Sequence, residues 1–165
     1  MPIQPGDKLP DVTFTIMTAD GPKPVTTAEV FKGRKVALFA VPGAYTPTCH
    51  KSHMPGFVDR VDELKAKGID VVACTAVNDI FVLSNWAKDT GAEGTITMLA
   101  DGSADFAKAV GLEIDLTSRG LGVRSKRYSM LVEDGTVKVV NVEDAPPQHS
   151  VSSAETLCSM IDRSL

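Results

Sequence analysis

The sequence reads Val41-Pro42-Gly43-Ala44-Tyr45-Thr46-Pro47-Thr48-Cys49-His50 at the junction of a predicted strand and a predicted helix. The apolar run before Pro42-Gly43 is typical of a buried strand, and Pro and Gly open loops. Thr46 fits a helix N-cap, with Pro47 at the first helical position, where its missing N–H costs nothing. The pattern therefore predicts a strand, a short loop and a helix that begins just before Cys49.

Cys49 is the third residue of that predicted helix. Its sulfur would lie among the unpaired N–H groups of the first turn, at the positive end of the helix dipole. Such a position favours the thiolate and lowers the pKa of a cysteine. In a capping box the cap hydroxyl bonds to the third helical N–H, which places Thr46 beside the thiol. A small, inert core cysteine is the alternative, but the loop, cap and proline together favour a reactive one.

These residues also carry a resemblance to a known family. Pro42, Thr46 and Cys49 match the Pro-x-x-x-Thr-x-x-Cys signature of peroxiredoxins, and PGAYTPTCHKSHMPGF, Pro42 to Phe57, resembles the type II (peroxiredoxin-five-like) branch. The resemblance extends over essentially the whole chain. It implies a thioredoxin-like fold and a peroxide-reducing enzyme that often forms homodimers.

The hydrophobic pattern independently predicts an α/β fold in one domain, residues 1–165. Strand–helix–strand units favour parallel pairs, and Asp134-Gly135 between two apolar runs predicts a hairpin. The result is a mixed central sheet with helices on both faces and an N-terminal β-hairpin. Strands are expected at 11–17, around 25, and at 35–41, 69–77, 95–99, 127–133 and 136–142. Helices are expected at 26–31, 47–68 with a break near Met54, 80–89, 104–110, and from Ser152 or Ser153 to about 163. Residues 112–125 are expected to form a loop.

Composition narrows the function classes. The net charge of −4 and the pI near 5.3 argue against nucleic acid or an anionic membrane as the main partner. No apolar run approaches the ~20 residues of a membrane span, and the first residues do not fit a signal peptide. The cysteines Cys49, Cys74 and Cys158 are odd in number and widely spaced, which fits a reducing compartment. A cytoplasmic location is therefore expected.

A peroxide-reactive thiolate also needs a fixed positive charge. Basic residues cluster in the second half of the chain at Arg119, Arg124, Lys126 and Arg127. Arginine offers five donors in a planar fork, which suits the polarisation of a peroxide. The resemblance assigns the catalytic role to Arg127, at the start of a hairpin strand, with Arg124 as the rival.

The resemblance implies a mechanism without a cofactor. The Cys49 thiolate would attack hydrogen peroxide or an organic hydroperoxide and become a sulfenic acid. Thr46 and Arg127 would hold the peroxide oxygens, and Pro42 would shield the sulfenic acid from water. Members with an internal disulfide carry a second cysteine before the last helix, where this chain has none. Glutathione, with or without glutaredoxin, is therefore the expected reductant.

Several alternatives stay open. Cys74 is the candidate resolving cysteine of a thioredoxin-dependent two-cysteine peroxidase, although it also fits a small core residue. A general thiol–disulfide oxidoreductase would need a Cys-x-x-Cys pair, and a non-catalytic redox sensor would keep the fold alone. Cys49, His50 and His53 place three candidate metal ligands together, but structural zinc sites need four, so no metal is expected. His53 is expected to pack or hydrogen-bond near the helix break instead, and Trp86 to lie in the core.

Overall fold

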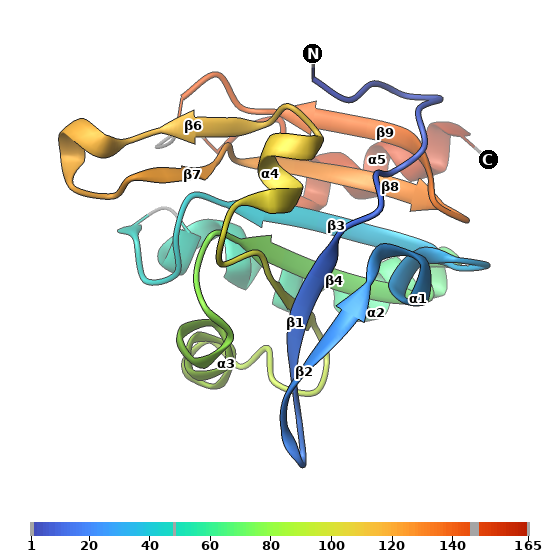
Figure 1. The fold of residues 1–165 in the computed structure, drawn as a ribbon. Helices are drawn as coiled ribbons and strands as arrows, with labels where there is room; N and C mark the ends of the chain where they lie inside the picture. The colour runs from blue at the N-terminus through green and yellow to red at the C-terminus, as the bar shows by residue number, and fades with distance from the viewer. Residues whose placement is uncertain (1, 48, 146–148, 165) are drawn as a thin grey trace.

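A seven-stranded mixed sheet forms the centre of the molecule (Figure 1). The computed structural model describes residues 2–47, 49–145 and 149–164, with the backbone alone for Cys49, Lys51 and 162–164. The strand order is β2-β1-β5-β4-β3-β8-β9, and a second sheet pairs β6 with β7. The strands are β1 Thr13–Thr18, β2 Gly21–Thr26, β3 Lys35–Val41, β4 Val71–Ala76, β5 Thr97–Ala100, β6 Glu113–Asp115, β7 Val123–Ser125, β8 Tyr128–Glu133 and β9 Thr136–Val142. The helices are α1 Thr27–Phe31, α2 Met54–Ala66, α3 Ile80–Asp89, α4 Asp105–Ala109 and α5 Ala154–Ser164.

The parallel strands β3, β4 and β5 end at the same edge of the sheet, so the loops that follow them lie close together. Val41 pairs with Ala76, and Ala76 with Ala100, so β3, β4 and β5 end together. On its other side β3 pairs with the antiparallel β8. In open α/β sheets, ligands bind at the carboxyl ends of strands where the direction of connection changes. The loop after β3 occupies such a position.

Helices cover both faces of the sheet, as the hydrophobic pattern predicts. One core cluster joins the sheet to α2, α3 and α5, and the other joins it to α1 and α4. β3 contributes alternate residues to the two clusters, Ala37 and Phe39 to the first and Val36 and Leu38 to the second. A strand buried on both faces has to be apolar throughout, which explains the run KVALFAV. The predicted thioredoxin-like fold with an N-terminal β-hairpin is confirmed.

Local signals in the sequence correctly place several element ends. Thr26 and Glu29 form a capping box at the predicted start of α1. The Asp134-Gly135 turn joins β8 to β9 with both residues in the left-handed region, at φ 49° and 78°, as a two-residue hairpin loop requires. Of the two predicted caps for the last helix, Ser153 accepts the Thr156 N–H at 3.1 Å. Ser152 has another partner, described below.

The prediction of a loop at residues 112–125 is wrong. This segment contains β6 and β7, paired in antiparallel register, and a short 3-10 turn at Thr117–Arg119. In Figure 1 this hairpin projects beyond the carboxyl end of β3. Strands of three residues are too short to show a clear alternation of polar and apolar residues. β6 and β7 therefore form because they pair with each other, and the sequence of either segment alone does not predict them.

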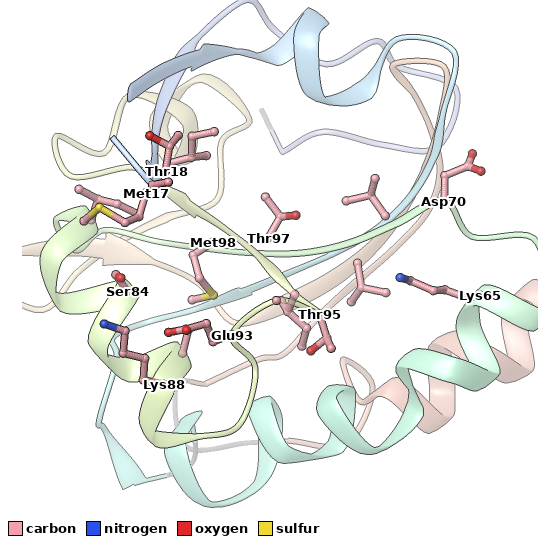
Figure 2. Close-up of a pocket in the computed structure, with 18 residues that line it drawn as sticks. Met17, Thr18, Lys65, Asp70, Ser84, Lys88, Glu93, Thr95, Thr97 and Met98 are labelled. Carbon is pink, nitrogen blue, oxygen red and sulfur yellow. The ribbon is translucent and has the colours of Figure 1, made fainter. Parts of the chain in front are cut away.

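A groove of about 600 Å³ lies elsewhere, between β1, the amino-terminal halves of β4 and β5, and α3 (Figure 2). Its walls include Met17, Val72, Ile80 and Met98. Exposed charged side chains stand around it, with Lys65 and Asp70 on one side and Lys88 on the other (Figure 2). Among the described residues, no helix has the length and hydropathy needed to cross a membrane.

Candidate active site

The loop after β3 is held by side chains from distant parts of the chain. Asn78 Oδ1 accepts the Ala44 N–H at 3.0 Å, and the Tyr45 hydroxyl donates to Asp89 Oδ2 at 2.5 Å. Tyr45 has a φ of 65°, a conformation that costs energy for a residue with a side chain. Contacts 34 and 44 residues apart in sequence thus fix a strained loop.

Thr46 begins the helical turn that contains Cys49. Its carbonyl accepts the His50 N–H at 2.9 Å, which is the first intrahelical bond expected of an N-cap residue. Its hydroxyl donates to the Gly43 carbonyl at 2.7 Å. That bond orients the hydroxyl oxygen and leaves its acceptor capacity available. The predicted contact between this hydroxyl and the Cys49 thiol lies outside the described residues.

Cys49 opens a π-helical turn, Cys49–His53, which continues into α2. The predicted break near Met54 is therefore a change from π to α geometry. Pro55 explains it, because a proline has no N–H to donate to the preceding turn and its ring crowds that turn's carbonyl. π turns inside helices occur often at functional sites.

His53, at the end of the π turn, connects this helix to Arg127. Arg127 Nη1 lies 3.0 Å from His53 Nδ1, and His53 Nε2 lies 3.0 Å from the Ser152 carbonyl. A guanidinium only donates and a carbonyl only accepts. His53 is therefore neutral, with its proton on Nε2.

Burial enforces the same protonation state. His53 is fully buried, with its ring against Phe39 and Phe57. Burial holds the pKa of His53 well below its ordinary value, and the charges of Arg127 and His149 add to this, against the opposing bond to Ser152. The Arg127 guanidinium, itself 2% exposed, therefore lies beside an uncharged ring.

Arg124, the rival of Arg127, also reaches the loop. Its Nε donates to Leu121 and its Nη1 to the Pro42 carbonyl, at 2.8 and 3.3 Å. A Cβ added at Gly43 would lie 2.8 Å from the same Nη1. Arg124 thus packs on the Pro42–Gly43 backbone, whereas Arg127 is bonded to the turn that contains Cys49.

His50 is fixed by Trp86, which the sequence predicts correctly as a core residue. Trp86 Nε1–H donates to His50 Nδ1 at 3.0 Å, and Tyr45 stacks on the His50 ring. Both ring nitrogens of His53 are also engaged. The imidazole atoms of the candidate metal set Cys49, His50 and His53 are thus largely committed to other partners.

The remaining cysteines lie in the core. Cys74 is 0% exposed in β4, between its strand partners Phe39 and Met98. Cys158 is 3% exposed on the inner side of α5. The Cys49 thiol lies outside the described residues, as does the segment 146–148 before the last helix.

Sequence reasoning missed the central role of His53 at this site. It predicts packing or a hydrogen bond near the helix break, which is confirmed, but not the link to Arg127. The two residues are 74 positions apart, and no local pattern joins them. A histidine on the apolar stripe of an interrupted helix, next to a candidate nucleophile, is the one signal that the sequence offers.

Comparisons with known proteins identify relatives of this chain. Residues 4–158 match the family model described as Redoxin. The chain is 48% identical to Peroxiredoxin-2E-2, chloroplastic, of Oryza sativa subsp. japonica, over 92% of this chain and 69% of that protein. It is 43% identical to Peroxiredoxin-2D of Arabidopsis thaliana, over 94% and 96%. The crystal structure of reduced Prx3 in complex with H2O2, from Vibrio vulnificus, superimposes with a TM-score of 0.92 at 46% identity, covering 96% and 99% of the two chains.

Proposed function

Because this chain belongs to the type II peroxiredoxins of the redoxin family and is a thiol peroxidase, we propose that Cys49 is its peroxide-reactive cysteine and that glutathione, with or without glutaredoxin, regenerates it. Hydrogen peroxide and organic hydroperoxides are the proposed substrates. One observation carries the site assignment: the bond between Arg127 Nη1 and His53 Nδ1. It fixes a buried guanidinium to the helical turn that begins with Cys49.

The proposed reaction is a displacement at a peroxide oxygen. The Cys49 thiolate forms an S–O bond to the terminal oxygen while the O–O bond breaks. The other oxygen leaves with the electron pair of that bond, takes up a proton and departs as water or alcohol. Arg127 is charged and rigid, so it stabilises the negative charge that develops on the leaving oxygen. The Thr46 hydroxyl, oriented by Gly43, is placed to bond a peroxide oxygen.

Burial of the other cysteines favours an external reductant. A resolving thiol has to reach the Cys49 sulfenic acid, and the two Cα atoms of a disulfide lie within about 7 Å. Cys74 lies in a central strand that is paired on both sides, and Cys158 faces the core. Either would have to leave packed structure. Glutathione, in contrast, can condense with the sulfenic acid and release water, and a second thiol can then attack the glutathione sulfur and displace the Cys49 thiolate.

Two measurements test this proposal. Stopped-flow oxidation of the reduced protein should be several decades faster than that of a free thiol, and each decade corresponds to ~1.4 kcal/mol of transition-state stabilisation. Turnover should then be compared with glutathione, with glutaredoxin plus glutathione, and with thioredoxin. Turnover with thioredoxin alone, together with a Cys49–Cys74 disulfide in mass spectrometry, would refute the external thiol.

We also propose a homodimer. Tyr45 and Phe81 are 45% and 60% exposed, and both adjoin the active-site loop or the helix that supports it. A second copy of the chain would cover apolar surface that is otherwise in water. Phe81→Asp should shift the sedimentation coefficient to that of a monomer, and an unchanged value would exclude this surface.

A further inference from the structure

A buried carboxylate lies behind the active site, just after β9. Glu143 is 4% exposed. Its Oε2 accepts the N–H groups of Ser150 and Ser152 at 2.8 and 2.7 Å and the Ser152 hydroxyl at 2.6 Å. Its Oε1 accepts the Ser150 hydroxyl at 3.0 Å. Hydrogen bonds to a charged acceptor are about twice as strong as neutral ones, so Glu143 holds the chain before α5 firmly.

The carboxylate is charged in the folded protein. Burial raises the pKa of Glu143, but the bonds from Ser152 and Ser150 outweigh burial and leave the pKa below its ordinary value. A neutral glutamic acid would lose acceptor strength towards the same donors. The hydrogen bonds from Ser150 and Ser152 to the Glu143 carboxylate, called the Glu143 clamp below, are thus all formed at neutral pH.

Two hydrogen-bonded connections link the Glu143 clamp to Arg127, the proposed catalytic arginine. Ser152, held by Glu143, presents its carbonyl to His53 Nε2, and His53 Nδ1 accepts from Arg127 Nη1. The Glu143 N–H donates directly to the Arg127 carbonyl at 2.9 Å. These contacts close a ring from Glu143 through Ser152, His53 and Arg127 back to Glu143. Each bond in the ring is directional, so the position of the guanidinium depends on the carboxylate.

We propose that Glu143 is a positioning residue for peroxide reduction, which acts through Ser152 and His53 on the Arg127 guanidinium. This inference rests on the role proposed above for Arg127. Glu143 does not react with the peroxide. It fixes the acceptor face of His53 and thereby the place of the charge that the leaving oxygen meets, and misplacement of such a group by about 1 Å can cost two decades in rate.

The test is a double-mutant cycle on the rate of Cys49 oxidation by hydrogen peroxide. Glu143→Ala is measured with Arg127 present and in an Arg127→Gln background. With Arg127 present, the second-order rate constant should fall about tenfold. In the Arg127→Gln background, the same change should alter the rate by less than about twofold, because the group that Glu143 positions is no longer there. A purely structural role predicts the same loss in both backgrounds, which would overturn the proposal.

Two matched variants serve as controls for the Glu143→Ala measurement. Glu143→Gln keeps a carbonyl oxygen for the bonds to Oε2 and an amide that can donate to the Ser150 hydroxyl, so its rate should stay within about threefold of the original. Ser150→Ala removes one bond from Oε1 and leaves Ser152 in place, so its rate should change by less than about twofold. A Ser150→Ala loss as large as that of Glu143→Ala would show that general order in this segment matters and not the link to His53.

The outcomes separate this inference from the proposed function. An Arg127→Gln variant that keeps the original rate refutes the role of Arg127 and the positioning role with it. A slow Arg127→Gln variant with a fast Glu143→Ala variant refutes the positioning role alone. If Glu143→Ala does not fold by circular dichroism, Glu143→Asp takes its place in the cycle. Its shorter side chain cannot span both serines, and it should show the same dependence on Arg127.

Discussion

The loop from Pro42 to His53 and the groove in Figure 2 lie on two sides of α3. α3 gives Trp86 and Asp89 to the loop, and Ile80, Ser84, Ala87 and Lys88 to the groove. The groove offers about 600 Å³ of space, but its charged side chains are exposed (Figure 2). At the loop, polar groups are instead bonded across long stretches of sequence. The comparison favours the loop over the groove as the site of the proposed chemistry, because the loop holds oriented polar groups and the groove offers only open volume.

The largest expected effect is that of a Cys49 variant, and it distinguishes the active-site loop from the groove. Cys49→Ser should abolish peroxide reduction, because a serine hydroxyl does not ionise near neutral pH and is not an effective nucleophile towards peroxide. Ser84→Ala with Lys88→Ala in the groove should leave the rate within about twofold, since surface changes of this kind have small effects. Peroxide consumption and stopped-flow traces measure both. Appreciable turnover by the serine variant would move the chemistry away from Cys49.

Thr46 provides the next largest effect. Thr46→Val removes the hydroxyl that Gly43 orients and keeps the shape of the side chain. The rate of Cys49 oxidation should fall by about one to two decades, as when other hydrogen bonds to the transition state are removed. Thr46→Ser keeps the hydroxyl and should stay within about threefold. Equal rates for the valine and serine variants would exclude Thr46 from substrate binding.

The two regions also differ in how well the sequence predicts them. The continuous run in β3, the capping box of α1 and the Asp79 cap of α3 depend on neighbours within a few residues. Local propensity and spacing therefore suffice to place the strand and helix that flank the site. Thr46 as an N-cap belongs to the same class, and its carbonyl bond to His50 confirms it.

The partners of the loop could not be predicted in this way. His53 meets Arg127 over 74 residues and Ser152 over 99, and Trp86 meets His50 over 36. Such pairs depend on strand order and on the angle at which helices pack, and a single sequence does not reveal either. Glu143 shows the same limit: near a chain turn it resembles any solvated carboxylate until the fold brings two serines to it.

Acid should lower the free energy of unfolding through His53, which lies at the proposed active site. The pKa of His53 is lowered in the folded protein, mainly by burial. The unfolded chain therefore binds a proton below about pH 6.5 that the folded chain does not bind. The contribution to stability is complete above that pH and is lost as the pH falls towards the folded pKa, by up to about 1.4 kcal/mol per pH unit.

Denaturant unfolding between pH 7 and pH 5.5 measures this slope. His149, with its pKa also lowered by burial and by Arg127, acts in the same direction, whereas Glu143 acts only below its ordinary range. His53→Gln should flatten the slope, and His149→Gln should keep most of it. Identical slopes for His53→Gln and the original protein would assign the acid sensitivity to other groups.

Gly43 should give the smallest of these effects, because one flexible side chain can absorb part of the change. A Cβ at Gly43 would lie 2.8 Å from Arg124 Nη1 and 3.2 Å from Thr46 Cγ2, closer than ordinary van der Waals contact. Gly43→Ala should therefore displace Arg124 from the Pro42 carbonyl and press on Thr46, and the oxidation rate should fall about threefold to fivefold. Gly102→Ala is the matched control, since its Cβ would meet nothing closer than 3.7 Å, and its rate should not change.

In an Arg124→Ala background the collision with Nη1 is gone, so the added effect of Gly43→Ala should shrink to less than about twofold. If it stays the same, the contact with Thr46 Cγ2 causes the loss, and the collision with Arg124 does not contribute to it.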